Sequence, residues 1–432
     1  MMSEVNYILK NGRVVDVNRN IDEVMDLGIQ NGKMADPAKV KNPIVVDCKD
    51  KVIAPGFIDV HVHLRQPGNT AAETVKTGTL AAAAGGFTAI VPMPNTNPAA
   101  DTPGAIEYLR QLAAKDSAVK IYPCGCMTKG YKGEEMAPIG GLKGAGVYAL
   151  SDDGKCVQDS ELMRNIVKYA KSFNLPILDH CEEEKLFAGG VMNEGKWSVL
   201  LGMNGVPGLA EELIVARDIM FARECDWKIH LQHISTAESV ELIRNARSKN
   251  IQVTGEATPH HISLTDEWIK KYDTNYKMNP PLRTEEDRLA LIAGLADDTI
   301  TVIATDHAPH TQTAKMVEFN HAPFGILGLE TAIPICLQEL YHTKVLTLSQ
   351  FISKFTVGPA DVLGFKNYDL RNGNAADITI LDLNDKFTID SSKFMSLSRN
   401  TPYNGWEVKG RAVATIVDGK FVYNIMTSEN IK

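Results

Sequence analysis

The sequence has no run of about 18 apolar residues and no cluster of lysine or arginine. The first absence argues against a membrane-spanning helix. The second, with a formal net charge of −8, leaves no electrostatic footprint for nucleic acid. We therefore expect neither a membrane nor a nucleic acid as a partner.

The sequence also lacks a cysteine spacing that would indicate disulfide bonds or a cysteine metal site. The seven cysteines are scattered, and the nearest pair, Cys124 and Cys126, is one residue short of a Cys-x-x-Cys motif. We expect reduced cysteines that pack inside the protein. The N-terminal residues lack the basic and apolar regions of a signal peptide, so the expected location is the cytoplasm.

The 432 residues do contain a repeated alternation of short apolar runs and helical segments. Most runs are followed by apolar residues at helical spacing, as at Leu162, Ile166 and Ala170. Eight such alternations predict an α/β fold of the (β/α)8 TIM-barrel class. The runs are 52–60, 87–91, 119–125, 146–150, 175–178, 228–231, 251–254 and 300–304.

The two ends of the chain carry a different pattern, with β-type runs and turn signals such as Asn11-Gly12 and Asp418-Gly419. We predict that residues 1–51 and 365–432 are the two halves of one small β-sandwich-like domain. Residues 52–364 would then form the metal-dependent catalytic barrel.

Histidines and aspartates follow the apolar runs where the predicted strands end. Because the C-terminal ends of barrel strands meet at one mouth, these residues are expected to converge. His61 and His63 are two apart and point to the same side of a strand. Imidazole and carboxylate ligands favour zinc, with iron or manganese as alternatives and calcium disfavoured. The candidates are His61, His63, Asp152, Asp153, His180, His233 and Asp306.

Each candidate has a structural alternative, because a single histidine at a strand end is more often hydrogen-bonded within the protein than bound to metal. The shared register favours a site. Asp152 and Asp153 are neighbours whose side chains diverge, so the pattern does not select between them. His230 lies inside its run and is expected to pack. Structural roles are also expected for His260, His261, His321 and His342.

Four motifs, at 56–68, 92–98, 151–154 and 304–310, together resemble the amidohydrolase superfamily and, more narrowly, the class I dihydroorotases. His61-Val62-His63 alone would indicate only the superfamily. The resemblance narrows to the dihydroorotases through Arg65, the Met-Pro-Asn-Thr-Asn-Pro run and the Asp-His-Ala-Pro-His run, whose combination is highly specific. The resemblance covers essentially the whole chain.

The resemblance implies a hydrolase that reversibly cyclises N-carbamoyl-L-aspartate to L-dihydroorotate in pyrimidine biosynthesis, with two Zn²⁺ per chain. Many superfamily members bridge their metals with a carbamylated lysine after the fourth strand, but residues 146–153 contain no lysine. That departure matches the class I dihydroorotases and disfavours a hydantoinase. The implied ligands are His61, His63 and Asp306 for one ion and His180 and His233 for the other, with Asp153 bridging.

The resemblance also implies the roles of residues around the metals. Asp306 would be the catalytic base as well as a ligand. The segment 310–323 would cover the mouth, with an ordinary exposed loop as the alternative. Arg65 could instead form a salt bridge at the rim, and Asn279 could simply belong to an Asn-Pro turn. Implied substrate contacts are Arg65, Asn95 and His310 at the α-carboxylate, and Asn279 with the backbone of Pro323 and Gly325 at the ring.

Two rival functions remain open. A hydantoinase or allantoinase would not need the same carboxylate contacts. A catalytically silent assembly partner of a transcarbamoylase would be expected to lose metal ligands, whereas this chain keeps every expected position. The expected partners are a small-molecule substrate, a second copy in a homodimer, and aspartate transcarbamoylase.

Overall fold

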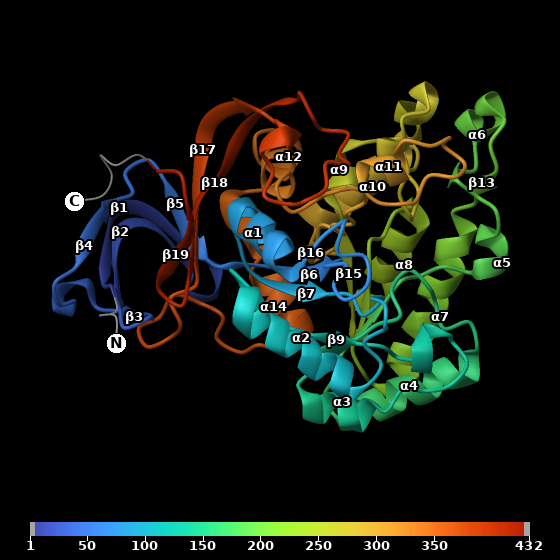
Figure 1. Cartoon of the computed structure of the whole chain (residues 1–432), viewed down its shortest axis with the longest axis horizontal. Helices are drawn as coiled ribbons and strands as arrows, with labels where there is room; N and C mark the ends of the chain where they lie inside the picture. The colour runs from blue at the N-terminus through green and yellow to red at the C-terminus, as the bar shows by residue number, and fades with distance from the viewer. Residues whose placement is uncertain (1–4, 427–432) are drawn as a thin grey trace.

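The computed structural model describes residues 5–426 and contains two units (Figure 1). One unit has a central barrel of parallel strands with helices outside it, and the other is a sheet built from both ends of the chain. Residues 1–4, on which the signal-peptide expectation rests, lie outside the described part. Within 5–426, no helix combines the length and apolar character needed to cross a bilayer.

The barrel has eight parallel strands, because β8 and β9 are successive pieces of one strand between β7 and β10. The ring closes where Val62 pairs with His307, just beyond the last strand. The predicted TIM barrel is therefore confirmed. Its strands are β6 (Phe57–Val62), β7 (Phe87–Pro92), β8 (Lys120–Ile121), β9 (Cys124–Gly125), β10 (Ala149–Leu150), β11 (Ile177–Asp179), β14 (Ile229–Leu231), β15 (Val253–Ala257) and β16 (Val302–Ile303).

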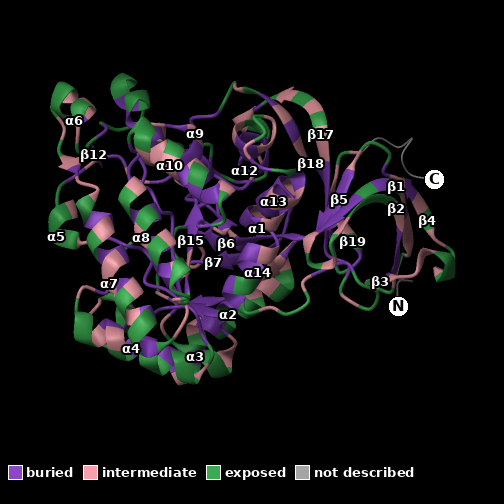
Figure 2. Ribbon diagram, turned by 180° about the vertical axis from the view of Figure 1, so that it is seen from behind, coloured by how far each residue is buried: buried purple, intermediate pink, exposed green. Residues whose placement is uncertain are grey.

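A helix follows each barrel strand and buries one face against it. In α4 the buried residues include Met163, Ile166 and Ala170, at helical spacing. Figure 2 shows the result, with buried strands inside and exposed outer helix faces. The helices are, in strand order, α1 (Val75–Gly85), α2 (Pro103–Asp116), α3 (Ile139–Ala145), α4 (Ser160–Ser172), α7 (Leu209–Cys225), α8 (Ala237–Ser248), α10 (Glu285–Ala296) and α12 (Ala332–Cys336).

Shorter elements are inserted between the barrel strands and their helices. Those that follow β11 lie at the far edge of the barrel from the terminal sheet (Figure 1). The chain then continues through two more helices after α12. The additional elements are α5 (Glu184–Phe187), β12 (Met192–Asn193), α6 (Lys196–Leu201), β13 (Gly205–Val206), α9 (Pro259–Ser263), α11 (Gln312–Lys315), α13 (Leu348–Ser353) and α14 (Val357–Leu363).

The expectation that 52–60 forms a single barrel strand is wrong. Residues 52–55 form β5, which pairs with β1 and β17 of the terminal sheet, and the barrel strand β6 starts at Phe57. Gly56 connects the two units. Only glycine fits at this position, because a Cβ there would lie 2.1 Å from the Thr88 hydroxyl oxygen. The terminal sheet therefore extends past the expected boundary at residue 51.

The terminal sheet has the strand order β19-β18-β17-β5-β1-β2-β3, with β4 on β1. The expectation of a turn at Asn11-Gly12 is wrong, because both residues lie within β1 at a bulge, where Asn11 has a φ of 60°. The Asp418-Gly419 turn is present between β18 and β19. The strands are β1 (Tyr7–Asp16), β2 (Ile21–Gln30), β3 (Lys33–Ala35), β4 (Ile44–Asp47), β5 (Val52–Pro55), β17 (Ile378–Thr388), β18 (Glu407–Val417) and β19 (Lys420–Asn424).

Phe355 seals the barrel near the start of its first strands. Its ring is fully buried, and its centroid lies 5.2 Å from that of Phe57 and 6.1 Å from that of Phe87. We predict that Phe355→Ala lowers the free energy of unfolding by about 3–5 kcal/mol, through lost contacts and a residual cavity. Urea unfolding followed by circular dichroism measures this, with Val24→Ala, at a 69% exposed residue, as the control. Equal effects of the two changes would contradict the packing described.

Candidate functional site

Six of the predicted metal-binding residues meet at the mouth of the barrel, around the carboxylate of Asp153. All are buried, although they come from strands far apart in the sequence. Asp306 completes the group on the side of His61 and His63, with its Oδ1 3.5 Å and 3.0 Å from their Nε2 atoms. The distances to the Asp153 carboxylate are 3.2 Å from His61 Nε2, 3.4 Å from His63 Nε2, and 3.5 Å from both His180 Nδ1 and His233 Nε2.

These separations fit ligands that surround a metal ion. Zinc bonds of roughly 2.0–2.1 Å place neighbouring ligand atoms of a tetrahedron about 3.3 Å apart. Within residues 5–426, His61 Nε2 is buried and has no hydrogen-bond partner, although it faces Asp153 and Asp306. The ligand atoms of His61, His63 and Asp306 lie within 4.8 Å of one another, as do those of His61, Asp153 and His233. The donor set therefore suits a divalent ion that prefers nitrogen and oxygen.

The charges at the mouth call for a cation. Among the described residues, no lysine or arginine forms an ion pair with the carboxylates of Asp153, Asp306, Glu256 or Glu182. Burial lowers the pKa of His61, but Asp153, Glu256 and Asp306 outweigh burial and raise it well above its ordinary value. The site thus holds surplus negative charge, which a metal ion can offset while the imidazoles stay neutral.

Glu256 holds two of the ligands from inside the barrel. Its Oε1 lies 2.6 Å from His61 Nδ1 and accepts a hydrogen bond from the backbone N–H of His233 at 3.1 Å. Its Oε2 lies 2.9 Å from Nε2 of His230, whose Nδ1 is 2.8 Å from Thr254 Oγ1. The carboxylate fixes the His61 tautomer so that Nε2 faces the site. The prediction missed Glu256 because the run was taken to end at Thr254, two residues before this inward-facing position.

Asp152 and Asp153 have separate roles. Asp152 accepts hydrogen bonds from the backbone N–H of Met127 at 2.8 Å and from the Thr128 hydroxyl, so it holds the preceding loop. Asp153 alone faces the histidines. The nearby Lys155 is exposed, and its ammonium lies 5.0 Å from the centre of the Tyr131 ring and forms no ion pair with Asp153 among the described residues. The structure therefore selects Asp153 as the member of the pair that faces the histidines.

Three site residues have left-handed backbone conformations that are unusual for side chains with a Cβ. The φ angles are 46° at Arg65, 31° at His233 and 47° at Asp306. Each such residue costs on the order of 1–3 kcal/mol, so the surrounding structure must enforce it. The surrounding structure therefore holds these three side chains in place against a conformational cost.

Asn95 and Asn279 contact the ligands directly. Asn95 Oδ1 lies 3.1 Å from His63 Nδ1, and its Nδ2 donates to the backbone oxygen of Asp153 at 3.1 Å. Asn279 Nδ2 lies 3.3 Å from His180 Nε2, while its Oδ1 is buried and finds no hydrogen-bond partner in the described part of the chain. Asn279 thus presents a free acceptor at the mouth and is more than a turn residue.

Arg65 is a cation without a carboxylate partner in the described structure. Its Nε donates to the backbone oxygen of Pro309 at 3.2 Å, and no ion pair involves it within residues 5–426. The alternative of a salt bridge at the rim is therefore wrong. Burial lowers the pKa of Arg65, although Asp306 and Asp153 oppose this. A guanidinium in this setting suits an anionic group such as a carboxylate.

The segment 310–323 is tied down at both ends. His310 Nε2 lies 2.7 Å from the backbone oxygen of Phe324, and burial lowers the pKa of His310 to about 3. The ammonium of Lys315 donates to the backbone oxygens of Pro323 at 2.9 Å and Gly325 at 3.0 Å. Much of the segment is exposed, but Lys315 anchors it. Its opening and closing stay a prediction.

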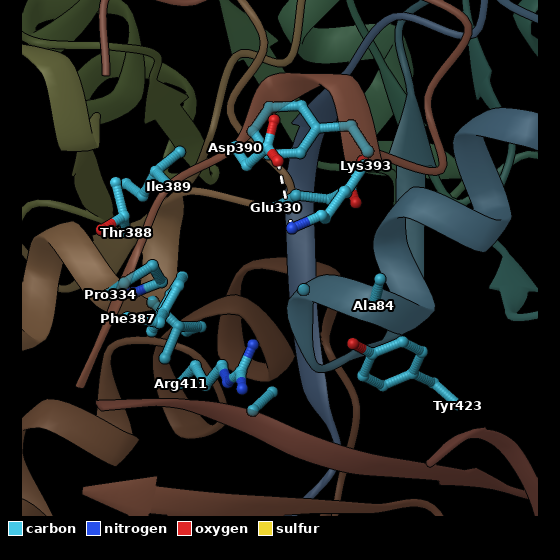
Figure 3. A pocket seen from close by; sticks show the side chains of 14 residues that line it. Ala84, Glu330, Pro334, Phe387, Thr388, Ile389, Asp390, Lys393, Arg411 and Tyr423 are labelled. Carbon is cyan, nitrogen blue, oxygen red and sulfur yellow. Dashed lines mark ion pairs between the residues drawn. The ribbon is translucent and has the colours of Figure 1, made fainter. Parts of the chain in front are cut away.

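A separate cavity of about 490 Å³ lies between α1, α12 and the strands β17 and β18. Figure 3 shows Glu330, Arg411 and Tyr423 among its lining side chains, and the Asp390–Lys393 ion pair at its edge. None of the predicted site residues lines it. The predicted site residues therefore lie outside this cavity, and the site is identified by the arrangement of their side chains at the barrel mouth.

Comparisons of sequence agree with this geometry. The family model described as Dihydro-orotase-like matches residues 50–239, and that of the Amidohydrolase family matches 210–423. The dihydroorotase of Acetivibrio thermocellus is 44% identical, covering 96% of this chain and 98% of its own. That of Pelotomaculum thermopropionicum is 47% identical, with the same two coverages.

Solved structures share the fold. The L-hydantoinase (dihydropyrimidinase) of Arthrobacter aurescens superposes with a TM-score of 0.86 at 24% identity, covering 98% of this chain and 96% of its own. The dihydropyrimidinase of Brevibacillus agri gives 0.84 at 22% identity, covering 97% and 95%. At such identities the likeness concerns the fold alone.

The role of Glu256 can be tested on metal binding. We predict that Glu256→Gln weakens zinc affinity by roughly 10–100-fold, because the amide keeps the shape but loses the charge that orients His61. Competition with a chromophoric chelator measures the affinity. Glu241→Gln, on the exposed side of α8, is the matched control. Equal zinc affinities in the two variants would show that Glu256 does not orient the ligands.

Proposed function

We propose that the barrel mouth interconverts N-carbamoyl-L-aspartate and L-dihydroorotate, because this chain belongs to the dihydroorotase family of amidohydrolases. The chain is a hydrolase that acts on a cyclic amide, in a step of pyrimidine biosynthesis. The observation that carries the proposal is the convergence of four histidines and Asp306 around Asp153, beside Arg65, which has no carboxylate partner among the described residues.

The family binds metal, and we propose two Zn²⁺ per chain. His61, His63 and Asp306 would hold one ion and His180 and His233 the other, with Asp153 between them. The surplus negative charge and the unpartnered His61 Nε2 support this arrangement. Such ions would polarise the amide carbonyl and lower the pKa of water to about 7.

Asp306 is proposed to carry the proton. Burial raises its pKa, but His61 and His63 outweigh burial and hold the pKa well below its ordinary value, so the carboxylate is ionised. In hydrolysis it would take the proton of the water that bonds to the ring carbonyl carbon. It would then deliver that proton to the amide nitrogen as the carbon–nitrogen bond breaks. In ring closure the same carboxylate would take the proton of the carbamoyl nitrogen.

The substrate is proposed to lie between Arg65 and the asparagines. Arg65, Asn95 and His310 would hold its α-carboxylate. Because His310 Nε2 already faces a backbone oxygen, its Nδ1 donates only when the ring is protonated, and a bound anion would raise the pKa of His310 accordingly. Asn279 Oδ1 is free to accept a ring N–H. The backbone of Pro323 and Gly325 would complete the ring contacts.

The cellular location and the protein partners are proposed from the cysteines, the exposed surface and the family likeness. We propose a cytoplasmic enzyme, and the seven free, buried cysteines support a reducing compartment. A homodimer is also proposed, with Val199 and Leu200, 81% and 64% exposed on α6, as support for a subunit contact. Association with aspartate transcarbamoylase rests on the family likeness. No membrane or nucleic-acid partner is proposed.

The proposed base predicts a sharp mutational effect. Asp306→Asn should keep the fold while kcat for L-dihydroorotate falls by about 10²–10⁴-fold, because the amide cannot carry the proton. Steady-state kinetics and circular dichroism measure both. Asp390→Asn, in the lining of the remote cavity, is the control. An Asp306→Asn enzyme within about threefold of the wild type would remove this role.

The function itself is tested by L-dihydroorotate hydrolysis with and without a chelator. The expected result is activity that the chelator abolishes and added Zn²⁺ restores. A kinetic preference for hydantoins or uncharged dihydropyrimidines would instead favour the hydantoinase alternative. An intact, metal-loaded protein without activity would favour the silent assembly partner.

A further inference from the structure

A segment that belongs by sequence to the terminal sheet reaches the barrel mouth. The connection between β17 and β18, residues 389–406, leaves the sheet and packs against the barrel. Asn400 lies in this connection and is only 5% exposed. Nothing in its local sequence marks it as a site residue, because the contact forms only in the folded chain.

The side-chain amide of Asn400 bridges two segments of the mouth. Its Nδ2 donates to the backbone oxygens of Ala308 at 3.0 Å and Gly325 at 3.2 Å. Its Oδ1 accepts from the backbone N–H of His310 at 3.1 Å, and its own backbone oxygen accepts from Leu327 at 2.9 Å. Both amide hydrogens and the amide oxygen are therefore engaged, a pattern that only a carboxamide can satisfy.

The two bridged segments are those that carry the proposed substrate contacts. One bears His310, and the other bears Pro323 and Gly325. They approach closely, since a Cβ on Gly325, whose φ is 112°, would lie 2.5 Å from the Cβ of Ala308. Any change in their separation would displace the groups that face the substrate.

The position of Asn400 is itself fixed by acidic side chains of the barrel. Glu330 accepts hydrogen bonds from the backbone N–H groups of Met395 at 3.0 Å and Ser396 at 3.1 Å. Glu73 accepts from the backbone N–H of Leu397 at 3.3 Å. These hydrogen bonds therefore hold residues 395–397 on the barrel, and Asn400 follows three residues later at the barrel mouth.

We infer that Asn400 is a positioning residue that sets the spacing between His310 and the backbone of Gly325, and so the affinity for substrate. The inference rests on the proposed function, because it assigns substrate contact to these two segments. None of the hydrogen bonds of Asn400 within the described residues goes to a proposed metal ligand. Its loss should therefore weaken substrate binding and leave the proton transfer at Asp306 in place.

The test is the kinetics of Asn400→Ala in the full-length, metal-loaded protein. We expect KM for L-dihydroorotate to rise about tenfold or more, with kcat within about threefold and zinc content unchanged. The matched control is Ser398→Ala on the same segment, because Ser398 is 4% exposed and its hydroxyl donates to the Ala72 backbone oxygen at 2.7 Å. Asn400→Ser serves as a milder second variant.

The outcomes separate the two proposals. An active wild type with equal KM in Asn400→Ala and Ser398→Ala overturns this inference alone, as does a fall in kcat at unchanged KM. Failure of both Asn400 variants to fold, judged by circular dichroism, shows a purely structural role and also overturns it. A wild type without activity on L-dihydroorotate overturns the proposed function and this inference together.

Discussion

The buried negative charge at the barrel mouth is the constraint on which the rest of the site depends. Asp153 is 3% exposed and is surrounded by imidazoles, with Asp306 and Glu256 close by. Isolated carboxylates in such a setting would be costly, so each needs a cationic or hydrogen-bonding partner. The histidines supply part of that compensation, and a divalent ion would supply the remainder while leaving them neutral.

The residues around this charge differ in their depth within the barrel. Inside the barrel, Asp59 accepts from the backbone N–H of His61 at 3.0 Å, and Glu256 holds the other side of the same residue. At the level of the ligands, Asn95 ties His63 to the Asp153 loop. Arg65 lies at the rim and has no carboxylate partner among the described residues. From the barrel interior to its rim, the order is therefore supporting carboxylates, then the proposed metal ligands, then the arginine proposed to bind the substrate's carboxylate.

The barrel and the candidate ligand positions at its mouth could be predicted from the sequence, because the alternation of strands and helices brings the C-terminal ends of the strands to one rim. The choice of Asp153 over Asp152 came only from the family resemblance, since two neighbouring residues follow the same run. The division of 52–60 escaped prediction, since the steric need for Gly56 beside Thr88 exists only between packed strands. Asn11-Gly12 reads as a turn but is a bulge, because pairing along β1 outweighs the local preference. Glu256 was missed because its strand continues past Thr254 to Ala257. Asn400 contacts the barrel mouth only through the tertiary structure, which the local sequence does not indicate.

The most direct test of the central claim is anomalous diffraction at the zinc edge from crystals of the zinc-loaded protein. The account predicts two peaks at the barrel mouth, one beside His61, His63 and Asp306 and one beside His180 and His233. Both should lie within bonding distance of the Asp153 carboxylate. The absence of a peak there, or a metal bridged by a modified lysine in place of Asp153, would contradict it.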